Sequence, residues 1–212
     1  MVCIPPTGEP LVGQSLRLDP TVPHDAAGLH AVYADPAAYE QGFAMSRPHP
    51  DLEETRHVVD AAVAARAADG TGRTAYTIRL VADSDLGEAG TIVGTSSLGD
   101  VDLAREHVHL GWTFYGPRWW GTAVNPEAKL LLLTHAFETC GFGRVKIQTD
   151  VINERSQAAI RKLGATFEGV TRRDVRRADG SWRDSAVFSI LVDEWPAVRA
   201  GLLDRLDAHR SG

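Results

Sequence analysis

The sequence predicts an α+β (mixed α/β) fold, in which helices flank a central, mixed and mostly antiparallel seven-stranded sheet. Two observations predict this class. Three β-rich runs follow one another with only turn segments between them, which is typical of an antiparallel meander. Beyond the meander a helix, a strand and a second helix alternate, and this passage implies a mixed sheet covered by helices.

Length and composition favour a single domain. With 212 residues, of which 43% are hydrophobic and 24% charged, the chain can bury one full core. We expect an extended N-terminal arm over residues 1–13, which are rich in proline and glycine, one domain over residues 14–207, and a disordered tail over residues 208–212.

The first half of the domain predicts one strand, two helices and the meander. Residues 14–18 alternate apolar and polar side chains as a strand does, and apolar spacing over residues 24–33 predicts a short first helix. The second helix begins at Asp51, with an acidic residue three positions on, and ends at Gly70. The meander strands cover residues 75–82, 91–98 and 107–115.

The segment between the two helices carries three large apolar residues in a loop. Tyr39, Phe43 and Met45 lie between two proline-bearing stretches. Exposed apolar residues on a loop often line a binding site, but they equally often pack beneath the loop as a satellite core. We name them as candidate substrate-binding residues and keep both interpretations open.

The second half predicts helices and strands in alternation. A helix over residues 125–140 is followed by Gly141 as a stop signal, and residues 144–150 form a buried strand. A further helix starts at Asn153 and ends at Gly164. Two strands (165–177 and 181–192) then form a hairpin, for which Asp179-Gly180 favours a primed turn, and an amphipathic helix (194–206) ends the domain.

The junction between the strand at 107–115 and the helix at 125–140 suits an anion. A helix N-terminus leaves backbone N–H groups without intrahelical partners and points them, with the positive end of the dipole, beyond the loop. Gly121 and Ala123 are small enough to let a phosphate approach, and Asn125 is a good N-cap. Arg118 adds a forked cationic donor.

Charge and composition argue against several classes of partner. A net charge of −6 argues against nucleic acid as the main partner. An anionic cofactor would still need local positive charge in such a chain, and Arg118, Lys129, Arg161 and Lys162 could supply it. No apolar run approaches the roughly 20 residues of a membrane helix, and no signal peptide is evident. With two cysteines that suit a reducing compartment, we expect a cytoplasmic protein without a membrane partner.

The motifs resemble those of the GNAT acetyltransferases. Residues 118–123 are similar to the pyrophosphate loop of that superfamily. Three further stretches resemble the RimJ/RimL branch of this superfamily, which contains ribosomal-protein N-acetyltransferases. Together, the four motifs extend the resemblance over residues 14–203. These stretches are Leu110-Gly111-Trp112; Asn153 to Ala165 with Glu168-Gly169-Val170; and Asp179-Gly180 with Arg183-Asp184 and Phe188-Ser189-Ile190.

The resemblance implies a fold and an activity. It implies the GNAT fold, in which strands four and five (here 107–115 and 144–150) splay apart, and one acyl-CoA N-acyltransferase domain. It also implies transfer of an acetyl group from acetyl-CoA to a primary amine, either a peptide N-terminus or a small molecule. A homodimer stays open.

The resemblance assigns the cofactor site residue by residue. The backbone at Trp112, Thr113 and Phe114 would hold the pantetheine and polarise the thioester carbonyl, and Asn153 would bind the pantetheine arm. Ser156 would lie near the departing sulfur and supply its proton, for which a water is the alternative. The pyrophosphate would be held by Arg118, Trp119, Trp120, Gly121, Thr122, Ala123 and Val124, where the two tryptophans either stack on adenine or pack as a wall.

The chemistry also needs a base near neutral pKa. His109 and Asp174 are the candidates, and solvent water is the third. His107 and His109 could share a metal, but no cluster of ligands accompanies them, so we predict no metal. The alternative to an enzyme is a catalytically inactive protein of the same fold that binds CoA or a protein partner.

Overall fold

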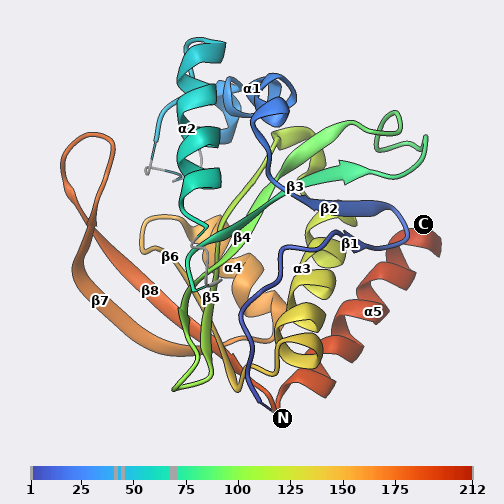
Figure 1. Cartoon of the computed structure of the whole chain (residues 1–212), viewed down its shortest axis with the longest axis vertical. Coiled ribbons are helices and arrows are strands. Elements are labelled where there is room, and N and C mark those ends of the chain that lie inside the picture. The colour runs from blue at the N-terminus through green and yellow to red at the C-terminus, as the bar shows by residue number, and fades with distance from the viewer. Residues whose placement is uncertain (1, 41–42, 44–45, 67–70, 212) are drawn as a thin grey trace.

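The computed structural model describes residues 2–40, 43, 46–66 and 71–211. Its strands are β1 (Leu11–Val12), β2 (Leu16–Pro20), β3 (Thr74–Leu80), β4 (Ile92–Asp102), β5 (His107–Tyr115), β6 (Arg144–Asp150), β7 (Thr166–Arg176) and β8 (Trp182–Leu191). Its α-helices are α1 (Ala26–Tyr33), α2 (Leu52–Ala64), α3 (Val124–Thr134), α4 (Glu154–Leu163) and α5 (Trp195–Ser211). In Figure 1, α3 and α5 lie side by side, while α1 and α2 lie together at another end of the sheet.

The described strands form one sheet in the order β1-β2-β3-β4-β5-β6-β8-β7. Only β5 and β6 pair in parallel, and all the other neighbours are antiparallel, as predicted. The sheet has eight strands instead of seven, because β1 lies within the expected N-terminal arm and pairs with β2. Glu127 of α3 explains the fold-back, since its Oε1 accepts the backbone N–H groups of Gln14, Ser15 and Leu16 at 2.6, 2.8 and 3.2 Å.

Helices cover opposite faces of the sheet at β4. Leu98 points into the main core, which also contains Leu132 of α3 and Leu202 of α5. Thr95 points to the other face, where its hydroxyl lies 3.1 Å from the hydroxyl of Tyr33 on α1. Side chains that alternate along a strand produce this division. Among the described strands, the main contacts of α1 are with β4 and those of α2 are with β3, so the α1–α2 pair is centred on that part of the second face.

Two boundaries differ from the sequence prediction at the third and last helices. The third helix, α3, starts at Val124, so Asn125 lies in its first turn and is not the N-cap. It is α-helical to Thr134 and continues as a π-helical turn (His135–Thr139). The last helix extends through residues 208–211, which we expected to be disordered. Arg210 favours this extension, because a cation stabilises a helix C-terminus and its Nη1 also binds Asp207 at 2.7 Å.

Other predicted features agree closely with the structure or fall on residues that it does not describe. Cys140 is fully buried, as expected of a core residue. β2, the counterpart of the strand predicted over residues 14–18, begins two residues later than predicted, at Leu16. Gly70, the expected end of the second helix, and Met45 lie outside the described residues. No helix in the part of the chain that is described is long and apolar enough to cross a membrane.

Candidate functional site

The two parallel strands separate after three paired positions. His107, Val108 and His109 pair with Arg144, Val145 and Lys146, and no further pairs follow. β5 nevertheless continues to Tyr115 and β6 to Asp150. The facing edges of residues 110–115 and 147–150 therefore carry backbone groups without a ladder partner. An extended ligand with amide groups can pair with such an edge.

A bulge in β5 redirects the backbone inside this opening. Gly111 pairs with Ser97 and Phe114 with Thr95, so Trp112 and Thr113 together oppose Ser96 alone. Trp112 has a φ of 49°, a left-handed conformation that costs a tryptophan about 1–3 kcal/mol. Such bulges often re-aim groups beside active sites.

A buried lysine supports the bulge from below. Lys129 of α3 donates through Nζ to the Thr113 hydroxyl at 2.8 Å and lies 3.5 Å from the Ser96 hydroxyl. Those two hydroxyls are 2.8 Å apart. Burial lowers the pKa of Lys129 to about 7. Lys129 is thus not an exposed cation for phosphates, as its position after the loop had suggested; it joins α3 to the bulge.

The loop after β5 leaves backbone donors free. A short 3-10 helix (Pro117–Trp119) leads to Gly121, whose φ of 75° suits glycine, and a Cβ added there would meet no atom within 4 Å. Ala123 is the N-cap of α3 and offers no side-chain cap. Within the described chain, the N–H groups of residues 121–123 donate to no acceptor. The loop and the helix N-terminus therefore fit an anion.

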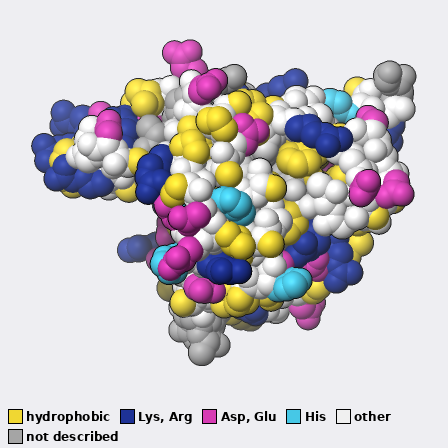
Figure 2. Space-filling view, turned by 90° about the horizontal axis from the view of Figure 1, so that it is seen from above, with side chains coloured by type: hydrophobic (Ala, Val, Ile, Leu, Met, Phe, Trp, Pro, Cys, Tyr) yellow, Lys and Arg dark blue, Asp and Glu magenta, His cyan; other side chains and the backbone are white. Residues whose placement is uncertain are grey.

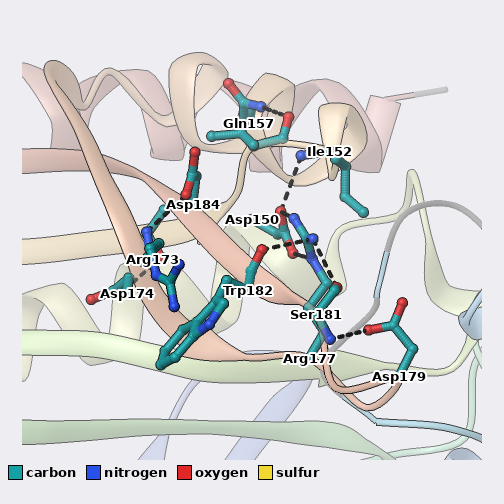
Figure 3. Close-up of polar contacts among 12 residues, drawn as sticks. Asp150, Ile152, Gln157, Arg173, Asp174, Arg177, Asp179, Ser181, Trp182 and Asp184 are labelled. Atoms are coloured by element: carbon teal, nitrogen blue, oxygen red, sulfur yellow. Dashed lines mark hydrogen bonds and ion pairs between the residues drawn. The ribbon is translucent and has the colours of Figure 1, made fainter.

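The start of α4 lies just beyond the end of β6. The side-chain oxygen of Asn153 accepts the N–H of Ser156 at 2.9 Å, so Asn153 is the predicted N-cap. The Ser156 hydroxyl has no hydrogen-bond partner in the described chain. Nearby, Figure 3 shows Arg177 reaching from the β7–β8 turn to Asp150, with N–O distances of 2.6 and 2.8 Å. These two hydrogen bonds hold the β7–β8 hairpin against the end of β6, beside the region where β5 and β6 separate.

His109 occupies the last paired position before the strands separate. It is 5% exposed, and its Nδ1 lies 3.1 Å from Oδ2 of Asp100, which also accepts from Lys146 Nζ at 3.2 Å. Burial lowers the pKa of His109, while the hydrogen bond from His109 lowers the pKa of Asp100 to about 2. The neutral imidazole therefore donates a hydrogen bond from Nδ1–H to the Asp100 carboxylate and keeps a lone pair on Nε2.

Nε2 of His109 is buried and has no hydrogen-bond partner in the described chain. A Cβ at Gly111 would lie 2.6 Å from it, so the ring fits there only because this position is glycine. An oriented imidazole with a free lone pair, at the apex of an opening lined by backbone amides, can accept a proton from a nucleophile.

The family follows from comparison with known proteins. The sequence pattern of the acetyltransferase (GNAT) domain family matches residues 15–166, which is most of the chain. The chain belongs to the GNAT acetyltransferase family. The predicted enzyme class, an acyl-CoA-dependent N-acyltransferase, is therefore confirmed, and acetyl-CoA is the acyl donor that the loop and the splay fit.

Individual relatives of this acetyltransferase support the predicted branch. "Putative ribosomal N-acetyltransferase YdaF" of Bacillus subtilis (strain 168) is 30% identical over 106 residues, or 50% of this chain and 57% of that protein. The match thus spans little more than half the length of that relative. Its name agrees with the RimJ/RimL-like branch.

Two solved structures share the GNAT fold of this chain. A "putative acetyltransferase" from T. thermophilus is 32% identical with a TM-score of 0.79, covering 93% of this chain and 97% of the other. A GCN5-related N-acetyltransferase from Brucella melitensis has a TM-score of 0.85, covering 97% and 89% of the two chains. At 23% identity, the second likeness concerns the fold alone. The predicted fold, including the splay, is confirmed.

The tryptophans of this acetyltransferase pack as a wall of the loop. Trp119 donates its ring N–H to the carbonyl of Leu86 at 3.0 Å, and Trp120 donates to that of Tyr115 at 3.0 Å. Arg155 of α4 stacks on Trp120, with its Cζ 3.5 Å from the ring centre. Arg118 stays exposed at the loop, where it can meet a phosphate.

The candidate acceptor residues separate into two groups. Tyr39 and Phe43 pack on the buried Phe114, with ring centroids 5.4 and 5.0 Å away, and burial raises the pKa of Tyr39 to about 12. They form the satellite core that the sequence left as one of two alternatives. Asp174 lies on the edge strand β7, where its Oδ2 accepts from the Ser185 hydroxyl at 2.6 Å. It does not contact His109.

Sequence reasoning missed two residues that hold His109. Asp100 and Lys146 come from β4 and β6, on either side of the histidine. The pairing of Gly99 with His109 brings Asp100 near the imidazole. The sequence prediction ended the second meander strand at residue 98, whereas β4 extends to Asp102, so the prediction left Asp100 outside the strand and its pairing with the next strand was missed.

Proposed function

We propose that this acetyltransferase moves an acetyl group from acetyl-CoA to a primary amine, by direct attack of the amine on the thioester. One observation carries the proposal: the free N–H groups of the loop, the unpaired edge of β5 and the free lone pair of His109 border one opening. The preferred acceptor in this proposal is a weakly basic amine, such as a protein N-terminal α-amine, and the setting is the cytoplasm. Two free cysteines fit that setting.

Each group has a role in the proposed mechanism. Acetyl-CoA, when bound, supplies the acetyl group as a reactive thioester. The N–H groups at residues 121–123 and Arg118 hold the negative charge of the pyrophosphate. The backbone N–H groups of the bulge stabilise the negative charge that develops on the carbonyl oxygen.

Proton transfer falls to two side chains. His109 accepts the proton of the amine through Nε2, and Asp100 stabilises the imidazolium that results. Ser156, whose hydroxyl has no partner in the described chain, donates a proton to the leaving sulfur and regains one from solvent water, to which the His109 imidazolium returns the proton of the amine. Asp174 is the competing base, and its hydrogen bond from Ser185 leaves it less available than His109.

A thiol-release assay tests the function. The protein is incubated with acetyl-CoA and, in turn, with peptide N-termini, polyamines, amino acids and aminoglycosides. Amine-dependent release of thiol with an acetylated product is the expected result. Binding of CoA without release on any amine would favour the inactive CoA-binding module, and failure to bind CoA would contradict acetyl transfer and favour a module that binds a protein partner.

A further inference from the structure

Arg183 lies on the same face of the sheet as the proposed base. It is the second residue of β8, and alternation places its side chain on the face of Ser185 and Ser189. Ser189 pairs with Lys146, which in turn pairs with His109. Arg183 and His109 therefore face the same side, from opposite flanks of the opening between β5 and β6.

The guanidinium of Arg183 carries an unfilled fork. Arg183 is 8% exposed, yet its Nε and Nη2 are buried without any hydrogen-bond partner in the described chain. These two donors lie along one edge of the guanidinium, and such an edge binds a carboxylate through two parallel hydrogen bonds. A buried charge without partners is unfavourable, so the missing acceptor requires an explanation.

The nearest carboxylates of the protein are already engaged. Asp150 and Asp174 both act on Arg183 electrostatically. However, Asp150 accepts both hydrogen bonds of the Arg177 fork (Figure 3), and Asp174 accepts from Ser185. Neither forms an ion pair with Arg183. The described chain therefore supplies no acceptor for this fork, and a bound carboxylate can supply one.

We propose that Arg183 binds a carboxylate of the amine acceptor, so that acceptors of this enzyme carry a carboxylate close to the amine. This inference rests on the proposed function and adds the substrate class. Either the α-carboxylate of a free amino acid or an acidic side chain beside a peptide N-terminus supplies that chemistry. A dianionic phosphate fits less well, because Asp150 and Asp174 would repel a second negative charge more strongly.

The neighbouring hairpin favours the approach of such an acceptor. Three exposed arginines (Arg172, Arg173 and Arg176) lie on β7, and two of them stack on Trp182, with Cζ 4.7 and 4.1 Å from its ring centre. Figure 2 shows basic side chains gathered on the lobe that projects at the left, where the β7–β8 hairpin lies in Figure 1. In a chain of net charge −6, this local positive field attracts an anion toward Arg183.

The test compares matched acceptors that differ only in the carboxylate. Peptides with glutamate or glutamine as the second residue form one pair, and a free amino acid and its amide form the other. We expect the wild type to favour the carboxylate member by about 10- to 100-fold in kcat/KM, chiefly through KM. The pair with the larger ratio identifies the source of the carboxylate.

Variants of Arg183 test whether this residue causes the preference for acceptors that carry a carboxylate. Arg183→Gln should abolish this preference, because it should lower transfer to the carboxylate member far more than transfer to the neutral member, and Arg183→Lys should restore part of the preference. Arg172→Gln removes an exposed arginine of the same hairpin and should keep the preference. If Arg183→Gln fails to fold, Arg183→Lys decides, because a lysine keeps the charge but lacks the fork.

Four results would overturn the inference. These are equal rates on both members of each pair, an unchanged preference in Arg183→Gln, an equal loss on both members in that variant, or a stronger preference for a phosphate-bearing amine. Calorimetric titration of the pairs into the CoA-bound protein separates this proposal from the proposed function. Selective binding of the carboxylate member, without any transfer, would uphold the fork and contradict the activity.

Discussion

His109 shows how two neighbours make a base from one imidazole. Its Nδ1 is 3.1 Å from a carboxylate that stays ionised, because the pKa of Asp100 is about 2. Burial lowers the pKa of the imidazole, so His109 is neutral and able to accept a proton through the range in which an α-amine, of pKa about 7.7 to 8.0, loses its own.

Activity should therefore rise with pH to a plateau near the pKa of the acceptor. His109→Gln should lower kcat about 100-fold and flatten the rise, since general base catalysis contributes about 10² to 10⁴ in rate. Asp174→Asn serves as the matched control, because Asp174 is the competing carboxylate. The measurement is a pH–rate profile of the three proteins. A profile of His109→Gln that superimposes on that of the wild type would make His109 an ordinary strand residue.

Ser156 acts on the leaving group in the proposal, and its effect should therefore appear in turnover. Ser156→Ala should lower kcat much more than it raises the KM for acetyl-CoA, because the thiolate needs its proton only as the bond breaks. The N-cap at Asn153 uses only the backbone of Ser156, so the fold should persist. Full turnover in this variant would transfer the role to water.

At the scale of elements, the loop between β5 and α3 separates folding from binding. Gly121→Val should abolish calorimetric CoA binding, since a branched side chain would enter the space that phosphate oxygens need. Gly121→Ala is the control: it also bears a penalty, of about 1–2 kcal/mol, for a positive φ, but adds only a methyl group. Unchanged affinity in a folded valine variant would place the pyrophosphate elsewhere.

Glu127 connects α3 with the turn between β1 and β2. Glu127→Gln should lower the free energy of unfolding by about 1–3 kcal/mol, because three backbone N–H groups lose a charged acceptor. Urea denaturation measures the change, with the exposed Glu88→Gln as control. Equal stability of the two variants would mean that this carboxylate contributes little.

Elements with strong local signals could be predicted from the sequence. Asn153 caps α4 and Gly164 ends it with a φ of 97°, since both signals depend on neighbours a few residues away. β1 could not be predicted, because two residues carry little pattern and Glu127 lies over one hundred positions along the chain. For the same reason the loop before α3 was predictable as a turn that leads into a helix N-terminus, but the partners of His109 and the free fork of Arg183, which depend on separate strands, were not.

At the scale of the whole molecule, the sheet consists of two blocks. Strands β1 to β5 form one and β6 to β8 the other, and three parallel pairs join them. The site borders on both blocks: the bulge and His109 belong to the first, while Asn153, Ser156 and Arg183 belong to or follow the second. Chemistry at this site therefore depends on how the blocks are held relative to each other.

The short seam between these blocks has a mechanical consequence. Because only three residue pairs join β5 and β6, the sheet should bend most easily there. A ligand that forms main-chain hydrogen bonds with the unpaired edges of these strands would extend the connection between the two blocks. Coenzyme A should therefore slow hydrogen–deuterium exchange in residues 107–115 and 144–150, while exchange between β3 and β4 stays the same. Uniform slowing across the sheet would contradict this localisation. Acetyl-CoA would then have two roles, as the acetyl donor and as a ligand whose hydrogen bonds connect the two blocks of the sheet.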